Sequence, residues 1–217
     1  MIGRTAPCLL VVALVASAAC DKDEPTPSPD KGEASSAEPS GFTKYQLKSK
    51  TSEARVQLAK LFDGASSYFS EEHIAAGDIA VFDGGGATAA HECPNDGNPS
   101  GSAGITPPLS VKCSDGPDGR CVPVAGEPKG PGQYSMDAWT KNKVWNGLNF
   151  MQEQGHYFHY DFRWVNDPAG YGGCKFTAQA FGDLDEDGVF STFERSGAAD
   201  ENGTNAGAGL YIDQELE

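Results

Sequence analysis

The residues best suited to chemistry form one acidic stretch, Asp183 to Glu194, with the sequence DLDEDGVFSTFE. Oxygen-bearing side chains stand at positions 1, 3, 5, 9 and 12 of this stretch, and Gly188 stands at position 6. Ca²⁺ takes about six to eight hard oxygen ligands, and this spacing allows one loop to wrap around a single ion. The sequence therefore predicts a Ca²⁺ site with the ligands Asp183, Asp185, Asp187, the carbonyl of Val189, Ser191 and Glu194.

The surroundings of the stretch favour a hairpin over the helix–loop–helix in which such loops are usual. Residues 175–181 alternate apolar and polar side chains with a period of two, which is typical of a strand. We therefore expect the calcium loop to join two strands. The alternative is an acidic turn that holds no ion.

No catalytic constellation is visible in the sequence. His156 and His159 fall on opposite faces of a predicted strand, and Ser102 lies in a Gly/Ser-rich stretch with no nucleophile elbow. A structural role is expected for all four histidines, which are His73, His91, His156 and His159. The sequence predicts a protein that is not an enzyme, and the alternative is a calcium-stabilised secreted or periplasmic hydrolase.

Four cysteines follow residue 20: Cys93, Cys113, Cys121 and Cys174. An even number outside the cytoplasm indicates two disulfides, for which three pairings are open. The turn-rich segment between Cys113 and Cys121 favours that pair, which leaves Cys93 with Cys174. A zinc site is the alternative, although the chain has no C-x-x-C pair.

The N-terminus has the features of an export signal. Arg4 is followed by an apolar run, Leu9–Ala16, and then by small residues that lead directly to Cys20. The run is well short of the roughly 20 residues that span a bilayer. We expect residues 1–19 to be a signal peptide and Cys20 to be lipidated, so that the protein is anchored in the bacterial cell envelope. An ordinary secreted protein with an unpaired Cys20 is the alternative.

The rest of the chain divides into a linker and one domain. Residues 20–41 are rich in proline, serine and charge and have almost no apolar side chains, as expected of a spacer. The globular domain is expected at 42–217. The formal net charge of −15 argues against nucleic acid as a partner, since phosphate binding needs clustered Lys and Arg.

The predicted elements define an α+β fold. Between Thr43 and His73 apolar residues recur every three or four positions, which predicts one long amphipathic helix. Further on, the patterns predict a helix at 136–150 and strands at 79–82, 109–112, 156–164, 175–181 and 189–193. We expect the long helix to pack on a C-terminal antiparallel sheet, with long loops between them.

Several phrases resemble the type IV pilins and the pseudopilins of type II secretion. They are FTKYQLKSKTSEARVQL at 42–58, SSYF at 66–69, WNGLNF at 145–150, HYFHYDF at 156–162 and FTAQAFGDLDEDG at 176–188. The resemblance implies a pilin-like head domain, with a binding or scaffolding role beside pilus or secretion machinery. Pseudopilins carry a calcium site near their C-terminus, which agrees with the loop at 183–194. In this chain, however, a polar linker stands where pilins have the apolar half of their helix.

Overall fold

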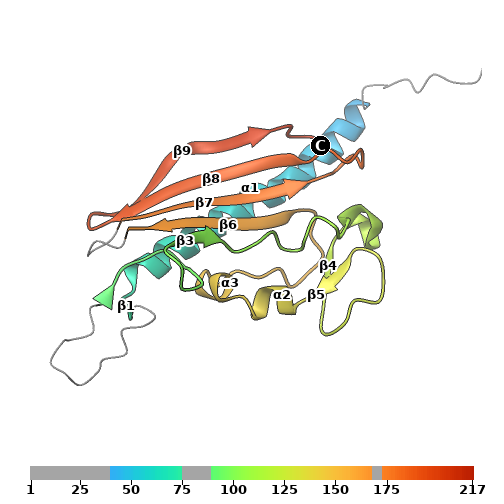
Figure 1. Ribbon diagram of the computed structural model, residues 1–217. Coiled ribbons are helices and arrows are strands. Elements are labelled where there is room, and N and C mark those ends of the chain that lie inside the picture. The colour runs from blue at the N-terminus through green and yellow to red at the C-terminus, as the bar shows by residue number, and fades with distance from the viewer. Residues whose placement is uncertain (1–39, 75–88, 168–172) are drawn as a thin grey trace, which may run out of the picture. The chain divides into compact units, whose positions relative to one another are not determined.

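The computed structural model describes residues 40–74, 89–167 and 173–217 (Figure 1). The predicted signal peptide, the predicted lipidation site Cys20, the predicted linker as far as residue 39 and the predicted strand at 79–82 lie outside the described residues. All described residues belong to one compact unit. No helix among them is long and apolar enough to cross a membrane.

Helix α1 (Gly41–Ser70) has 30 residues, and its N-terminus is capped by the Ser40 hydroxyl, which accepts the Thr43 N–H at 3.3 Å. The predicted helix is thus present, with ends two to three residues from those expected. Its buried positions recur every three or four residues, as one helical face requires. They are Leu47, Thr51, Ala54, Leu58, Leu61, Ala65 and Phe69.

A five-stranded antiparallel sheet carries this helix on one face (Figure 1). Its strands, in spatial order, are β3 (Ser100–Ser102), β6 (His159–Asn166), β7 (Cys174–Gly182), β8 (Ser191–Asp200) and β9 (Gly203–Asp213). The α+β fold with a long helix on an antiparallel sheet is therefore confirmed. Two predicted strands are found in shifted form, since β6 starts at His159 and β8 extends to Asp200, while β9 is an addition.

The contact between α1 and the sheet combines small and aromatic side chains. Ala178 and Ala180 of β7 are fully buried, and their small size lets the helix approach the sheet closely. Beside them the ring of Phe176 lies 5.4 Å from that of Phe62 in α1 and 5.6 Å from that of Phe162 in β6. Burial of such rings is the main stabilising contribution here, at about 1.5–3 kcal/mol for a fully buried side chain.

Short elements fill the connections. They are β1 (His73–Ile74), β2 (Ala89–Ala90), the 3-10 turns η1 (Cys113–Asp115) and η2 (Pro117–Gly119), β4 (Val122–Val124), β5 (Gln133–Ser135), α2 (Asp137–Thr140) and α3 (Lys143–Gly147). The predicted helix at 136–150 is interrupted, because Asn142 caps a new helix by accepting the Val144 N–H at 2.9 Å. The predicted strand at 109–112 is wrong: the Val111 N–H donates to the Pro108 carbonyl at 2.9 Å and closes a turn.

Candidate metal centre and its surroundings

The acidic stretch connects β7 to β8, in the hairpin that the strand pattern predicted. Carboxylate oxygens of Asp183, Asp185 and Asp187 all lie within 4.8 Å of one another, which is close enough to hold one metal ion. Asp183 is half-buried at the end of β7, whereas Asp185 and Asp187 are exposed. These three aspartates are the ones that the sequence singled out.

The backbone of the loop is bent, which brings the three aspartate carboxylates close to one another. Glu186 has φ of 70° and Gly188 has φ of 89°, a conformation that favours glycine at the second position. Asp183 Oδ2 accepts the Gly188 N–H at 3.2 Å, and Asp187 Oδ1 accepts the Val189 N–H at 2.7 Å. Asp183 Oδ1 is buried and has no hydrogen-bond partner among the described residues. A buried carboxylate oxygen without a donor is costly, and a cation would satisfy it.

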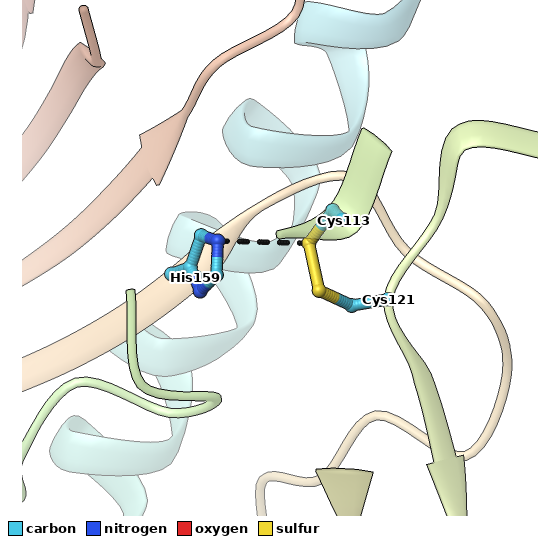
Figure 2. A group of neighbouring side chains, drawn as sticks. All are labelled: Cys113, Cys121 and His159. Atoms are coloured by element: carbon cyan, nitrogen blue, oxygen red, sulfur yellow. Dashed lines mark hydrogen bonds between the residues drawn. A yellow bond between two sulfur atoms is a disulfide. The ribbon is translucent and has the colours of Figure 1, made fainter. Parts of the chain in front are cut away.

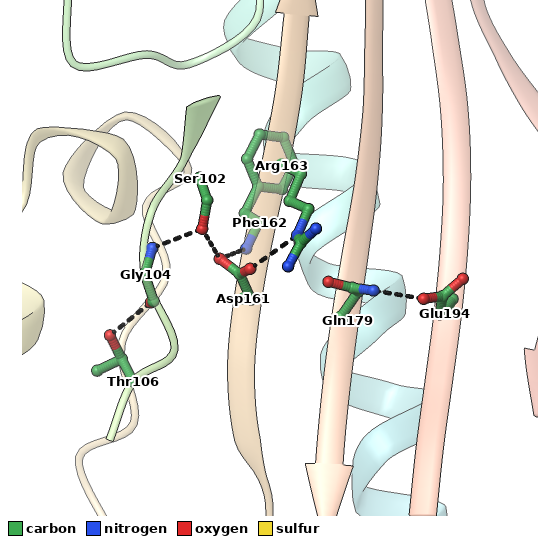
Figure 3. Close-up of polar contacts among 8 residues, drawn as sticks. All are labelled: Ser102, Gly104, Thr106, Asp161, Phe162, Arg163, Gln179 and Glu194. Carbon is green, nitrogen blue, oxygen red and sulfur yellow. Dashed lines mark hydrogen bonds and ion pairs between the residues drawn. The ribbon is translucent and has the colours of Figure 1, made fainter. Parts of the chain in front are cut away.

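Two other predicted ligands make hydrogen bonds within the sheet. Ser191 is fully buried at the start of β8, and its hydroxyl donates to the Gly182 carbonyl at 2.9 Å. Glu194 lies three residues further along and accepts a hydrogen bond from Gln179 across the sheet (Figure 3). A strand advances about 3.3 Å per residue, so it carries Glu194 away from the loop, whereas a helix would turn it back. Val189, whose carbonyl completes the predicted set, remains in the loop itself.

The carboxylate that joins the aspartates is one that the sequence did not indicate. Burial, the negative charges of Asp185 and Asp187 and a hydrogen bond to Asp185 together raise the pKa of Glu217. No motif links Glu217 to the loop, since β9 must first return along β8 to bring this residue back. Glu217 therefore lies near Asp185 and Asp187, and a cation bound at the loop would reduce the repulsion among these carboxylates.

Both predicted disulfides are present, Cys93–Cys174 and Cys113–Cys121. The first joins two cysteines that are 81 residues apart in the chain and ties the loop before β3 to the start of β7. Because disulfides persist in oxidising compartments, they indicate an extracytoplasmic location.

A histidine lies against the second disulfide (Figure 2). His159 Nε2 is 3.6 Å from Cys113 Sγ, while His159 Nδ1 is 2.8 Å from the Pro107 carbonyl, to which it donates. The ligand atoms of Cys113, Cys121 and His159 form a group within 4.8 Å, which is the geometry of the zinc alternative. The two sulfurs are bonded to each other, however, and offer no thiolate to a metal.

The second buried histidine belongs to a chain of hydrogen bonds. Trp139 Nε1 donates to the Tyr134 hydroxyl at 2.7 Å, and that hydroxyl lies 2.7 Å from His156 Nε2. His156 Nδ1 in turn lies 2.7 Å from the Phe158 carbonyl. Each donor in the chain meets one acceptor when His156 is neutral, which is the mark of a structural network.

Ser102 bonds to a carboxylate, and no hydrogen bond joins it to an imidazole in the described part of the chain. Ser102 Oγ donates to Asp161 Oδ1 at 2.6 Å and accepts the Gly104 N–H at 2.9 Å (Figure 3). Asp161 is almost fully buried and also accepts the Phe162 N–H and Arg163 Nε. These bonds hold the loop that follows β3 against β6.

Comparisons of the chain with models of protein families, with curated proteins and with solved structures find no match.

Proposed function

We propose that this protein is a lipid-anchored, pilin-like head domain that acts by binding or scaffolding at the bacterial cell envelope, without enzymatic activity. The observation that carries the proposal is α1 lying along one face of a five-stranded antiparallel sheet, the arrangement of a pilin head. The resemblances at 42–58 and 176–188 support it. The two disulfides support the part that concerns export.

The N-terminal turns of α1 suit a displayed domain. Phe42 and Tyr45 are 70% and 73% exposed, so the helix begins clear of the sheet. In a pilin the helix continues from here into an apolar half that builds the filament. A charged linker takes that place in this chain. It is unsuited to a filament core, because burying charges such as Asp21 and Asp23 without partners would cost several kcal/mol each. We therefore propose display on a lipid anchor and association with pilus or secretion machinery.

The test of this function begins with the anchor. Intact mass of the protein purified from its own envelope should show an acylated Cys20 as the first residue, and Cys20→Ala should release the domain into the soluble fraction. A pulldown of the anchored protein should then enrich envelope machinery. A wild-type protein that is soluble and carries no lipid would contradict the anchor, and hydrolytic activity of the purified domain would contradict the non-enzymatic role.

We further propose that the β7–β8 loop binds one Ca²⁺ through Asp183, Asp185 and Asp187, with Glu217 as an additional carboxylate. Hard oxygen donors suit this ion, and the unpartnered Asp183 Oδ1 supports an ion at this place. The bound ion would remove repulsion among the carboxylates. It would stabilise the fold by about 2.7 kcal/mol at a hundredfold excess over the dissociation constant.

Calorimetry with single variants separates the two ligand sets. Asp185→Asn and Asp187→Asn should remove the binding heat and the rise in melting temperature in millimolar calcium. Glu194→Gln should retain both, because Glu194 is bonded to Gln179 away from the loop. Loss of binding in Glu194→Gln would restore the twelve-residue ligand set, and a wild-type protein without binding heat would leave an acidic turn.

The rival function, a calcium-stabilised hydrolase, has less support. The imidazoles of His156 and His159 each donate to a backbone carbonyl, and neither contacts a serine hydroxyl in the described part of the chain.

A further inference from the structure

The hairpin that joins β8 to β9 carries an acceptor motif for N-linked glycosylation. Its residues Asn202-Gly203-Thr204 match the pattern Asn-x-Ser/Thr, in which x is any residue except proline. The complete sequence has one other triplet of this form, Asn98-Pro99-Ser100, which its proline excludes. The chain therefore offers a single site of this kind, and the structure allows its accessibility to be judged.

The turn uses the backbone of Asn202 and leaves its side chain free. Asp200 pairs with Gly203 across the turn, and Asp200 Oδ1 accepts the Asn202 N–H at 2.8 Å. Gly203 supplies the positive φ, 109°, that closes the hairpin. The Asn202 carboxamide is exposed and has no hydrogen-bond partner among the described residues.

The third residue of the motif is partly exposed beside α1. Thr204 Oγ1 accepts a hydrogen bond from the Ser66 hydroxyl of α1 at 3.0 Å, which leaves its own O–H able to donate. Beside the turn lies a hollow of about 560 Å³. Asp200, Glu201, Gly203 and Thr204 contribute to its wall, together with residues of α1. One face of the motif therefore borders open space.

The position of the hairpin in the fold favours access. Thr204 lies beside Ser66, near the C-terminal end of α1, whereas the acidic loop shares a hollow with Thr43 at the N-terminal end. The β8–β9 turn therefore lies at the end of the domain opposite the point where the chain enters at residue 40 (Figure 1). Nothing in the described part of the chain covers it.

We propose that Asn202 is the acceptor of an N-linked oligosaccharide, added after export from a lipid-pyrophosphate donor. In this transfer Asn202 Nδ2 forms a bond to the anomeric carbon of the first sugar. The bond from that carbon to the pyrophosphate oxygen breaks, the lipid pyrophosphate leaves, and the amide loses one proton. No electrons are exchanged. The inference rests on the export part of the proposed function and is independent of the calcium site and of the resemblance to pilins.

The test is peptide mapping of the full-length protein purified from the envelope of the cell that makes it. Trypsin cuts after Arg195, and no Lys or Arg follows in the sequence, so the peptide that begins at Ser196 contains the whole motif. We expect this peptide to carry the mass of an oligosaccharide, localised to Asn202 by fragmentation. Asn202→Gln and Thr204→Val should both return the peptide to its bare mass.

Two matched controls separate the motif from a general effect on folding. Thr204→Ser keeps the motif and should keep the glycan, and so should Asn205→Gln, which changes the neighbouring asparagine outside it. An exported wild-type protein with both disulfides and a bare Asn202 would overturn the inference alone, as would a glycan attached to another residue. A protein found in the cytoplasm with free thiols would overturn both the inference and the export part of the proposed function.

Discussion

His156 should make the fold sensitive to mild acid. Its side chain is 1% exposed, and burial lowers its pKa from 6.5 to about 4. The hydrogen bond from Nδ1 to the Phe158 carbonyl partly opposes this shift, whereas at Nε2 the neutral ring accepts a hydrogen bond from the Tyr134 hydroxyl. Protonation would place a hydrogen on both nitrogens, and the Tyr134 hydroxyl would then lose its acceptor.

The direction of the effect follows from proton binding. Between about pH 4 and pH 6.5 the unfolded chain binds a proton at His156 that the folded protein does not bind. The contribution of His156 to stability is therefore fully present above pH 6.5 and is lost as the pH falls through this window. The pKa difference, from 6.5 to about 4, corresponds to about 3 kcal/mol at about 1.36 kcal/mol per pH unit.

The partly buried Glu53 acts in the opposite direction. Burial raises the pKa of Glu53, which accepts hydrogen bonds from Tyr157 N–H and the Tyr160 hydroxyl. Its contribution is present below pH 4.5 and is lost as the pH rises through its folded pKa. The wild-type pH profile therefore sums opposing effects, and the contribution of His156 must be measured as a difference between variants.

The assay is urea unfolding of the oxidised protein from pH 4.5 to pH 7.5. Between pH 7 and pH 5 the wild type should lose more free energy of unfolding than His156→Gln, which does not titrate, by about 2 kcal/mol. His73→Gln, which removes a half-exposed imidazole, serves as the control and should follow the wild type. A constant difference between wild type and His156→Gln over this range, or an NMR titration that finds His156 charged at pH 6, would refute the reasoning.

Two further predictions concern stability at neutral pH. Replacing Cys93 and Cys174 by serine should lower the free energy of unfolding by about 4 kcal/mol, because this disulfide closes a loop of 81 residues. Replacing Cys113 and Cys121 should lower it by less than about 3 kcal/mol, because their loop spans only 8 residues. Urea unfolding that gives the reverse order would contradict this. Tyr134→Phe should lower the free energy of unfolding by about 2–5 kcal/mol, since it leaves Trp139 Nε1 and His156 Nε2 buried without partners. The control Tyr211→Phe, at a side chain that is 58% exposed, should lower it by almost nothing. Equal melting temperatures of the two variants would argue against the network.

Local pattern was sufficient for the elements that bury one face. The three- and four-residue spacing in α1 and the alternation in β7 reflect a helix stripe and a sheet face that must leave water. In β6 the alternation predicted the strand, but His159 and Asp161 on its polar face are buried as well. The pairing of Cys113 with Cys121 could also be predicted, since a short turn-rich segment separates them. The grouping of Asp183, Asp185 and Asp187 depends on a single turn, so their spacing alone indicated it.

Tertiary structure decided what depends on a partner distant in the sequence. Strand β9 is rich in Gly and Ala and has little strand preference of its own, and it is held as a strand by pairing with β8. That pairing brings Glu217 back to the acidic loop. The pairing of β7 with β8 also places Glu194 beside Gln179 and away from the aspartates. A local motif specifies which oxygens are near in sequence, but the direction of the strand that follows decides which of them can reach one ion.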